Sequence, residues 1–453
     1  MQTINQLRAG ELTGARHLKL SCGLTSFPPE ILQLADTLEV LDLSGNALST
    51  LPAGFAQLKE LRIAFFSDNA FTELPEVLGR CPKLTMVGFK ANRIRHVPPR
   101  ALPRGLRWLV LTDNEIEALP REIGACTELQ KLMLAGNRLT ILPESLAQCE
   151  RLELLRIAAN CFDELPAWLL TMPRLSWLAY SGNPFGAKLE VEALSSVAID
   201  DVSWSSLALE DLLGEGASGI IHRAQMNHDG DGLRDVAVKM FKGMVTSDGF
   251  PSSEMAASMR AGTHPNLIGV LGRVVDHPAG LDGMVMRLVD PGMQNLAGPP
   301  SLQSCTRDVY ASSTAFDMRA LLRLAHSIAS AAEHLHDLGI MHGDLYGHNI
   351  LHLQDGEAVM GDFGAASFYD ADSGEIAQGL QRLEVRAFGC LLEELIDRNA
   401  SGEESGILAR LKDLKSACLS MQVELRPLFG EINATLRSIV SPGHHSVENA
   451  CAG

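Results

Sequence analysis

The stretch Leu129–Asn137, which reads LQKLMLAGN, decides the fold of the N-terminal part of the chain. It follows the pattern L-x-x-L-x-L-x-x-N, and its last residue recurs every 22 or 23 residues, at Asn46, Asn69, Asn92, Asn114, Asn137, Asn160 and Asn183. A period of this length predicts a solenoid in which each repeat adds one short strand and buries its leucines against its neighbours. The asparagine side chains are expected to bond backbone groups at the turns.

The segments between the strands support the same interpretation. Most of the asparagines are followed about five residues later by Leu-Pro, and proline disfavours a second sheet on the convex side. An irregular repeat around Leu18 and Leu20 has Gly23 in place of asparagine, as expected of a capping repeat. Three cysteines in matching contexts, Cys81, Cys126 and Cys149, predict buried thiols. The pattern resembles the leucine-rich-repeat family and predicts eight repeats.

Side chains between the leucines of each strand are expected on the concave face, because side chains alternate across a strand. Most of them are apolar, and an exposed apolar surface with aromatic residues is typical of protein binding. The alternatives are ordinary packing between strands, or a Trp177 covered by the following domain. The candidate partner-binding residues are Ile63, Phe65, Met86, Trp108, Met133, Leu154 and Trp177.

A second motif lies in the C-terminal half, where residues His342–Asn349 read HGDLYGHN and Asp362-Phe-Gly follows. An acid such as Asp344 can orient a hydroxyl nucleophile and accept its proton. An amide at Asn349 and a second acid at Asp362 can hold Mg²⁺ on the phosphates of a nucleotide. Asp and Asn alone would be ordinary turn formers, so the interpretation depends on what precedes them.

Three further motifs precede this one in the order that phosphoryl transfer needs. They are Gly214-x-Gly216-x-x-Gly219, Val-Ala-Val-Lys239, and Glu254 followed by His-Pro-Asn-Leu267. The glycine pattern alone could be a plain hairpin, but the four motifs together resemble the eukaryotic-type protein kinase family.

The resemblance implies roles for particular residues. Lys239 would bind nucleotide phosphates and pair with Glu254 on the next helix, and Asp344 would accept the substrate proton. Asn349 and Asp362 would bind Mg²⁺. Met286 would be the gatekeeper and Arg287 to Val289 the hinge against adenine. The implied cofactors are ATP and Mg²⁺, and the nucleotide-binding candidates are Gly214, Gly216, Gly219, Ile221, Ala237, Lys239, Met286, Arg287, Val289 and Leu351.

Two departures from the family pattern lie in the motif around Asp344. Gly343 stands where many protein kinases have arginine, so no basic pocket is expected for an activating phosphate. Tyr346 stands where serine/threonine kinases place a lysine that steadies the γ-phosphate. Its hydroxyl could substitute for that lysine, or its presence could slow the chemistry.

The third departure follows Asp362. No Ala-Pro-Glu follows, and Glu384 comes only 22 positions later, where it takes the place of the aspartate that starts the large C-lobe helix. Arg426 would then lack its usual glutamate, and the nearby Glu375 is a poorly spaced substitute. A shortened peptide-docking platform is the consequence.

The predicted fold is an α/β leucine-rich-repeat solenoid followed by a bilobal α+β protein-kinase-like domain. We expect the solenoid at residues 1–187, a short linker at 188–203, the kinase-like domain at 204–440 and a disordered tail at 441–453. Residues 318–338 have the apolar spacing of an amphipathic helix. As a whole the chain resembles soluble, bacterial-type leucine-rich-repeat protein kinases.

The composition restricts the function. The 453 residues are 46% hydrophobic and 21% charged, which suits a soluble protein of two or three domains. A net charge of −17 argues against nucleic acid or an anionic membrane as main partner. Nine scattered cysteines without a CxxC pair, and no apolar run near 18 residues, predict a cytoplasmic protein without a membrane span.

The leading hypothesis is an ATP- and Mg²⁺-dependent serine/threonine protein kinase whose repeats recruit a protein partner or substrate. Because Ala-Pro-Glu is missing, a small-molecule phosphotransferase of the aminoglycoside or choline kinase type is an alternative. A pseudokinase scaffold is another. The oligomeric state and the substrate stay open.

Overall fold

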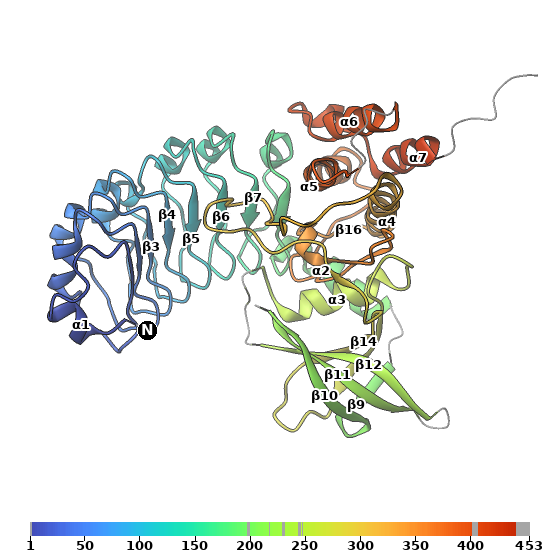
Figure 1. Ribbon diagram of the computed structural model, residues 1–453, viewed down its shortest axis with the longest axis horizontal. Coiled ribbons are helices and arrows are strands. Elements are labelled where there is room, and N and C mark those ends of the chain that lie inside the picture. The colour runs from blue at the N-terminus through green and yellow to red at the C-terminus, as the bar shows by residue number, and fades with distance from the viewer. Residues whose placement is uncertain are drawn as a thin grey trace, which may run out of the picture.

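The computed structural model describes residues 2–196, 200–216, 218–228, 232–242, 246, 248–400 and 406–440. The N-terminal repeats form a curved arc, and a two-lobed domain adjoins the C-terminal end of that arc (Figure 1). The predicted tail at 441–453 lies outside the described residues.

The repeat domain contains the eight predicted repeats, and the short helix α1 (Ile4–Arg8) precedes them. Each repeat contributes one three-residue strand to a single parallel sheet in sequence order. The strands are β1 (His17–Lys19), β2 (Val40–Asp42), β3 (Ile63–Phe65), β4 (Met86–Gly88), β5 (Trp108–Val110), β6 (Lys131–Met133), β7 (Leu154–Arg156) and β8 (Trp177–Ala179). Short 3₁₀ helices occupy the convex side, as the prolines predict: η1 (Pro29–Leu34), η2 (Ala53–Gln57), η3 (Glu76–Arg80), η4 (Pro99–Ala101), η5 (Arg121–Ala125), η6 (Glu144–Gln148), η7 (Ala167–Thr171) and η8 (Pro184–Gly186).

A ladder of asparagine side chains connects the repeats. Asn137 donates from Nδ2 to the carbonyl oxygens of Leu111 and Leu134, both at 2.9 Å, and its Oδ1 accepts from the amide of Ile116 at 3.0 Å. Each such side chain satisfies backbone groups that would otherwise be buried without partners. The predicted thiols Cys81, Cys126 and Cys149 are buried, and burial raises the pKa of Cys126 to about 11.

The prediction of a linker at residues 188–203 is wrong in part, because this segment forms a helix and a strand. Helix α2 (Ala187–Ser196) packs against helix α3 (Pro251–Ala261). Strand β9 (Asp200–Ser203) pairs in parallel with β13 (Val270–Val275) and so joins the sheet of the following lobe. Residues 197–199 lie outside the described part. The N-terminal lobe therefore begins at strand β9 rather than at residue 204.

The N-terminal lobe is a six-stranded sheet in the order β10-β11-β12-β14-β13-β9. Its further strands are β10 (Leu207–Glu215), β11 (Gly219–His228), β12 (Gly232–Phe241) and β14 (Gly283–Arg287), preceded by η9 (Trp204–Ser206). Lys239 on β12 lies opposite Met284 on β14, and Ala237 lies opposite Met286. This register places the predicted phosphate-binding lysine and the predicted gatekeeper on neighbouring strands.

The C-terminal lobe is mostly helical. Its helices are α4 (Met318–Asp337), α5 (Glu375–Ile396), α6 (Gly406–Cys418) and α7 (Phe429–Val440), with η10 (Gly347–Asn349) and η11 (Val423–Leu425). Two small sheets complete it, formed by β15 (Gln294–Asn295), β17 (Ile350–His352) and β18 (Ala358–Met360), and by β16 (Ile340–Met341) and β19 (Ser367–Phe368). Asp317 caps the N-terminus of helix α4, which matches the predicted amphipathic helix.

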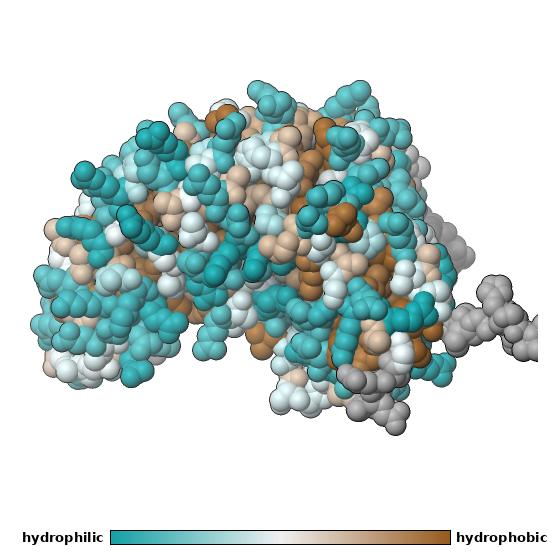
Figure 2. All heavy atoms as spheres, turned by 90° about the horizontal axis from the view of Figure 1, so that it is seen from above, coloured by the Kyte–Doolittle hydropathy of each residue, from teal (hydrophilic) through white to brown (hydrophobic). Residues whose placement is uncertain are grey.

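The repeat domain and the C-terminal lobe share their hydrophobic cores. Leu154 and Trp177 of the repeats are buried in the core of the lobe, while Met341, Leu380 and Leu383 are buried in the core of the repeats. Seen from above, hydrophilic side chains dominate the N-terminal repeats, and hydrophobic residues gather over the half that holds the two lobes (Figure 2). Because buried apolar area is the main favourable term in association, the two parts form one packed unit.

No helix among the described residues is long and apolar enough to cross a membrane.

Candidate active site

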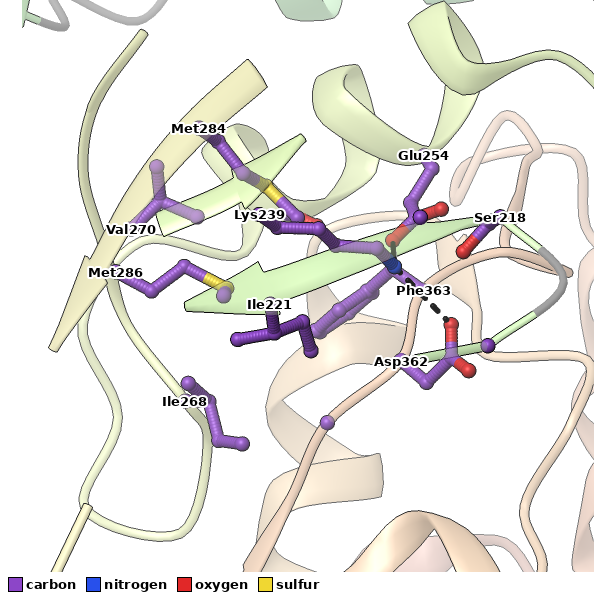
Figure 3. A pocket seen from close by; sticks show the side chains of 14 residues that line it. Ser218, Ile221, Lys239, Glu254, Ile268, Val270, Met284, Met286, Asp362 and Phe363 are labelled. Carbon is purple, nitrogen blue, oxygen red and sulfur yellow. Dashed lines mark hydrogen bonds and ion pairs between the residues drawn. The ribbon is translucent and has the colours of Figure 1, made fainter. Parts of the chain in front are cut away.

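A buried lysine lies at the centre of the cleft between the lobes. Lys239 forms an ion pair with Glu254 of α3, and its Nζ lies 3.7 Å from Oδ1 of Asp362 (Figure 3). Burial alone would lower the pKa of Lys239, but the carboxylates of Glu254 and Asp362 outweigh it and raise the pKa. Lys239 is therefore a fixed cation, and the predicted pairing of lysine with the acid on the next helix is observed.

Glu254 is enclosed more completely than its partner. Burial raises the pKa of its carboxyl to about 7, against the opposing effect of Lys239. Its helix begins at Pro251, so Glu254 lies in the first turn, where the helix dipole favours a negative charge.

The cavity next to Lys239 has a polar end and an apolar end (Figure 3). Lys239, Glu254, Asp362 and Ser218 occupy the polar end. The apolar end is lined by Ile221, Ile268, Val270, Met284 and Met286. An apolar slot that leads to a cation suits a flat ring joined to a phosphate chain, which is the shape of a nucleotide.

Five of the ten predicted nucleotide-binding residues line this cavity as the described residues define it. They are Gly216, Gly219, Ile221, Lys239 and Met286. Gly214, Ala237, Arg287, Val289 and Leu351 are not among its lining residues. Of these, Ala237 packs in the same small core as Met286. Five further lining residues were not predicted from the sequence: Ser218, Ser258, Ile268, Val270 and Met284. Only Val270 and Met284 lie in strands, where apolar alternation was an available signal.

The catalytic loop, residues 342–349, holds the predicted base. Asn349 donates from Nδ2 to the backbone oxygen of Asp344 at 2.9 Å and to its Oδ2 at 2.8 Å. Both bonds use the amide nitrogen of Asn349, which leaves the amide oxygen for a cation. Asp362 is about half exposed and follows strand β18. An amide oxygen and one carboxylate are a fitting donor pair for Mg²⁺, which takes its other ligands from water and phosphate.

No group of three or more His, Cys, Asp or Glu residues that could hold a metal occurs in the described part of the chain. A magnesium site here would consist of Asn349, Asp362 and the nucleotide rather than a cage made only of protein groups.

Glu384 anchors the catalytic loop from below. Its carboxylate is fully buried in α5 and accepts bonds from the amides of His342 at 3.1 Å and Gly343 at 2.7 Å, and from His336 at 2.8 Å. Burial opposes its ionisation, but these partners outweigh burial and hold its pKa below the usual range. The predicted role of Glu384 in place of an aspartate is consistent with these contacts. Its helix, however, begins at Glu375, well before the predicted start.

Arg156, on strand β7 of the repeats, is a further site residue that was not predicted from the sequence. It is fully buried and donates to three groups: Asp248 Oδ1 at 2.6 Å, the carbonyl oxygen of Gly343 at 3.1 Å, and Asp344 Oδ1. Burial would lower its pKa, but the carboxylates of Asp344 and Asp248 raise it. A single arginine between Met133 and Ala179 in one concave column was the only signal in the sequence.

Close packing of the backbone explains why glycine stands at position 343. Gly343 has a φ of 74°, and a Cβ there would meet the carbonyl oxygens of Ala365 at 2.5 Å and of Leu178 on β8 at 2.7 Å. The arginine of many protein kinases is therefore opposed at this position by the positive φ, by Ala365 of the same lobe and by Leu178 of the repeats.

Tyr346 also packs against the repeats. Its ring stacks on that of Trp177 with centroids 4.2 Å apart and planes 7° apart, and Trp177 donates from Nε1 to the carbonyl oxygen of Leu345 at 3.0 Å. The Tyr346 hydroxyl is buried without a hydrogen-bond partner among the described residues. The suggestion that this hydroxyl replaces the missing lysine is therefore wrong for this conformation.

The repeats also occupy the place left by the missing Ala-Pro-Glu. Among the described residues, Arg426 donates to three carbonyl oxygens, those of Pro173 at 2.6 Å, Ser420 at 2.9 Å and Arg382 at 3.0 Å. Glu375 is not among the described groups that bond Arg426, so the suggested pairing is wrong. Burial, with no carboxylate bound to it, lowers the pKa of Arg426 to about 10. A loop of the repeat domain thus fills the position of the absent glutamate.

The concave apolar stripe is not open to solvent, contrary to the expectation from sequence. Leu154 and Trp177 are buried in the C-terminal lobe, and Ile63 and Met86 pack against the buried Cys305. Phe65, Trp108 and Met133 are half-buried. Cys305 belongs to the loop of residues 296–316, which reaches back over the repeats (Figure 1), and the neighbouring Thr306 hydroxyl bonds Glu153 of the repeats. The stripe is therefore largely an intramolecular interface.

Comparisons with known proteins agree with this architecture. The family described as protein tyrosine and serine/threonine kinase matches residues 207–387, and leucine-rich-repeat families match residues 37–58 and 104–162. CBL-interacting protein kinase 22 of Oryza sativa subsp. japonica is 32% identical over 168 residues, which cover 36% of each chain. A probable LRR receptor-like serine/threonine-protein kinase of Arabidopsis thaliana is 26% identical over 226 residues, covering 45% of this chain and 34% of that protein.

The human PH domain leucine-rich repeat-containing protein phosphatase 1 is 32% identical over 108 residues, 6% of its length. The chain thus spans well under half of the relatives it matches. The fold and these matches agree on one arrangement: leucine-rich repeats, followed by a region that matches the protein tyrosine and serine/threonine kinase family.

Proposed function

We propose that this chain is an ATP- and Mg²⁺-dependent protein kinase that phosphorylates serine or threonine hydroxyls. The observation that carries the proposal is the position of Lys239, which contacts both Glu254 and Asp362 beside an apolar slot. This arrangement can bind phosphates with a fixed cation and still present a half-exposed carboxylate to a metal.

Each residue then has one task. Lys239 binds the nucleotide phosphates, and Glu254 holds Lys239 in place. Asn349 and Asp362 hold Mg²⁺, which when bound neutralises charge on the phosphates. Asp344 orients the acceptor hydroxyl and takes its proton. Serine/threonine specificity is supported by the name of the Arabidopsis relative, a probable LRR receptor-like serine/threonine-protein kinase, whereas the matching family also includes tyrosine kinases.

A small-molecule acceptor is the second candidate, and one specific observation favours it. Strands β7 and β8 pack directly on the catalytic loop through Arg156 and Trp177, on the side where a peptide platform is missing. An acceptor small enough to reach Asp344 beside these strands would fit without a platform. The names of the relatives favour a protein acceptor.

Recruitment of a protein by the repeats stays a proposal, restricted to the part of the concave face that the loop of residues 296–316 leaves half exposed. Val40, Phe65 and Trp108 lie there. We also infer a cytoplasmic location, supported by the eight described cysteines, none of which forms a disulfide.

The test is transfer of radiolabelled γ-phosphate from Mg·ATP by the full chain, with Asp344→Asn in parallel and phosphoamino-acid analysis of the product. Label on serine or threonine that disappears in the variant is the expected result. Label on a small hydroxyl compound alone would favour the second candidate. If the chain binds nucleotide but labels no acceptor, the scaffold hypothesis replaces both.

A further inference from the structure

The kinase-like domain has no cation of its own at the two catalytic-loop positions where its family pattern leads us to expect one. Gly343 has no side chain, and the Tyr346 ring is stacked on Trp177. Yet Asp344 is paired, and the cation that pairs with it comes from strand β7 of the repeats, which is 188 residues earlier in the chain.

Arg156 joins two parts of the site that must be held in register. Its Nε donates to Asp248, just before helix α3, which carries Glu254. Its Nη atoms donate to Gly343 and Asp344 on the catalytic loop. A planar guanidinium can hold several acceptors in a fixed geometry, which the single ammonium group of lysine cannot do.

The start of helix α3 and the residue before it also contact helix α2 and the last repeat. Ser253 donates to Glu190 of helix α2 at 2.8 Å, and a Cβ added at Gly182 would lie 2.5 Å from the ring of Phe250. The end of the solenoid is therefore packed against the segment that sets the position of Glu254.

The rest of the cleft is assembled while Arg156 is bound. Lys239 is paired with Glu254 and lies near Asp362, and Asn349 is bonded to Asp344. A contact that only blocked the site would not require these groups to be in place. Their arrangement favours a supporting role for Arg156.

We propose that Arg156 of the repeat domain is a positioning residue for phosphoryl transfer, which holds Asp344 against helix α3 in place of a cation at position 343 or 346. This inference rests on the proposed function. The repeats are then part of the catalytic unit, and full activity requires both domains in one chain. Arg156 acts through Asp344 and is not itself assigned a contact with substrate.

The first experiment compares kcat and the KM for ATP in Arg156→Gln, Arg156→Lys and Arg386→Gln. Arg386 is the matched control, since it is also a buried arginine at this interface, bonded to Ser176 at 2.8 Å, but among the described residues it forms no hydrogen bond or ion pair with the catalytic loop. We expect kcat to fall about 100-fold in Arg156→Gln, because small misplacements of reacting groups have effects of this size. Arg156→Lys should be intermediate and Arg386→Gln close to wild type, with the KM for ATP unchanged in all three.

A rise of kcat in Arg156→Gln would overturn the proposal, because it would show an inhibitory contact. Equal losses in Arg156→Gln and Arg386→Gln would overturn it as well, because they would show a merely structural role. Chemical rescue gives a further readout: methylguanidinium should restore part of the activity of Arg156→Ala and none of that of Arg386→Ala.

Amide hydrogen exchange tests the positioning without any need for turnover. In Arg156→Gln, the peptide that holds the catalytic loop should exchange faster than in wild type, while in Arg386→Gln it should not. Unchanged exchange in Arg156→Gln would refute the positioning role even if the chain proved to be no kinase. A wild-type chain that transfers no phosphate to any acceptor would refute only the proposed function.

Discussion

The two sides of Asp344 differ in how far they follow the family pattern. On the nucleotide side, Lys239, Glu254 and Asp362 lie in their expected motifs and contact one another. On the acceptor side, Gly343 and Tyr346 depart from the pattern, and both contact the repeats. The departures are therefore not scattered losses of function. They coincide with the surface on which the repeats pack.

The nucleotide side is expected to be the more sensitive to substitution. Lys239→Met should lower phosphoryl transfer at least about 1000-fold, as loss of an electrostatic group at the reacting phosphate does elsewhere. The fold should survive, because burial already raises the pKa of Glu254 to about 7 and loss of the Lys239 charge would raise that pKa further, so the carboxyl can take up a proton. Radiolabel transfer and a thermal unfolding curve measure the two effects. Turnover within tenfold of wild type would remove Lys239 from the site.

On the acceptor side, replacing Gly343 by the arginine of the family pattern is expected to destabilise the fold. Gly343→Arg should destabilise the chain by about 3 kcal/mol or more, because a left-handed φ and two close carbonyl oxygens both oppose a side chain. Gly280→Arg is the control, since Gly280 has a φ of 64° but no atom within 4 Å of its Cβ position. It should cost about 1 kcal/mol, the strain alone. Equal losses in urea unfolding would show that the repeats do not constrain Gly343.

Two tryptophans on the concave face compare the part of the stripe that the C-terminal lobe covers, at Trp177, with the part that is half exposed, at Trp108. Trp177→Ala should cost about 3–5 kcal/mol, because Trp177 is fully buried against Tyr346. Trp108, half-buried beneath Lys131, should cost less. If Trp108→Ala reduced capture of a protein partner while activity and stability held, the recruiting proposal would gain support. A larger loss of stability at Trp108 than at Trp177 would contradict the arrangement of this interface.

What the sequence could predict depended on the range of the interaction. The eight repeats could be predicted from a local period. The nucleotide side could be predicted because its residues lie in short motifs, each of which can be recognised within a few residues of sequence. Arg156 could not be assigned, because its partners Asp248 and Asp344 lie 92 and 188 residues away. The covering of Met86 by Cys305 was hidden for the same reason. The start of α5 at Glu375 reflects the missing platform, whose place the repeats have taken.

The smallest expected effect concerns His348, which lies between the two sides of Asp344. Its Nδ1 bonds Asp308 Oδ1 at 2.7 Å, and its Nε2 lies 4.0 Å from Asp344 Oδ2. Burial opposes its protonation, but the bond to Asp308 and the charge of Asp344 raise its pKa. A raised pKa means that the folded chain binds the proton more tightly than the unfolded chain does. This stabilisation is complete below the ordinary pKa of about 6.5 and is lost as pH rises through the folded value.

His348→Gln should therefore lower the free energy of unfolding more at pH 6 than at pH 9, with the difference measured by urea titration at each pH. His326 is a suitable control, because burial lowers its pKa and its removal should produce the opposite trend. A loss in His348→Gln that did not vary with pH would mean that the ring is held by packing alone. In that case the charge on the acceptor side of Asp344 would come from the repeats, through Arg156, without a contribution from this histidine.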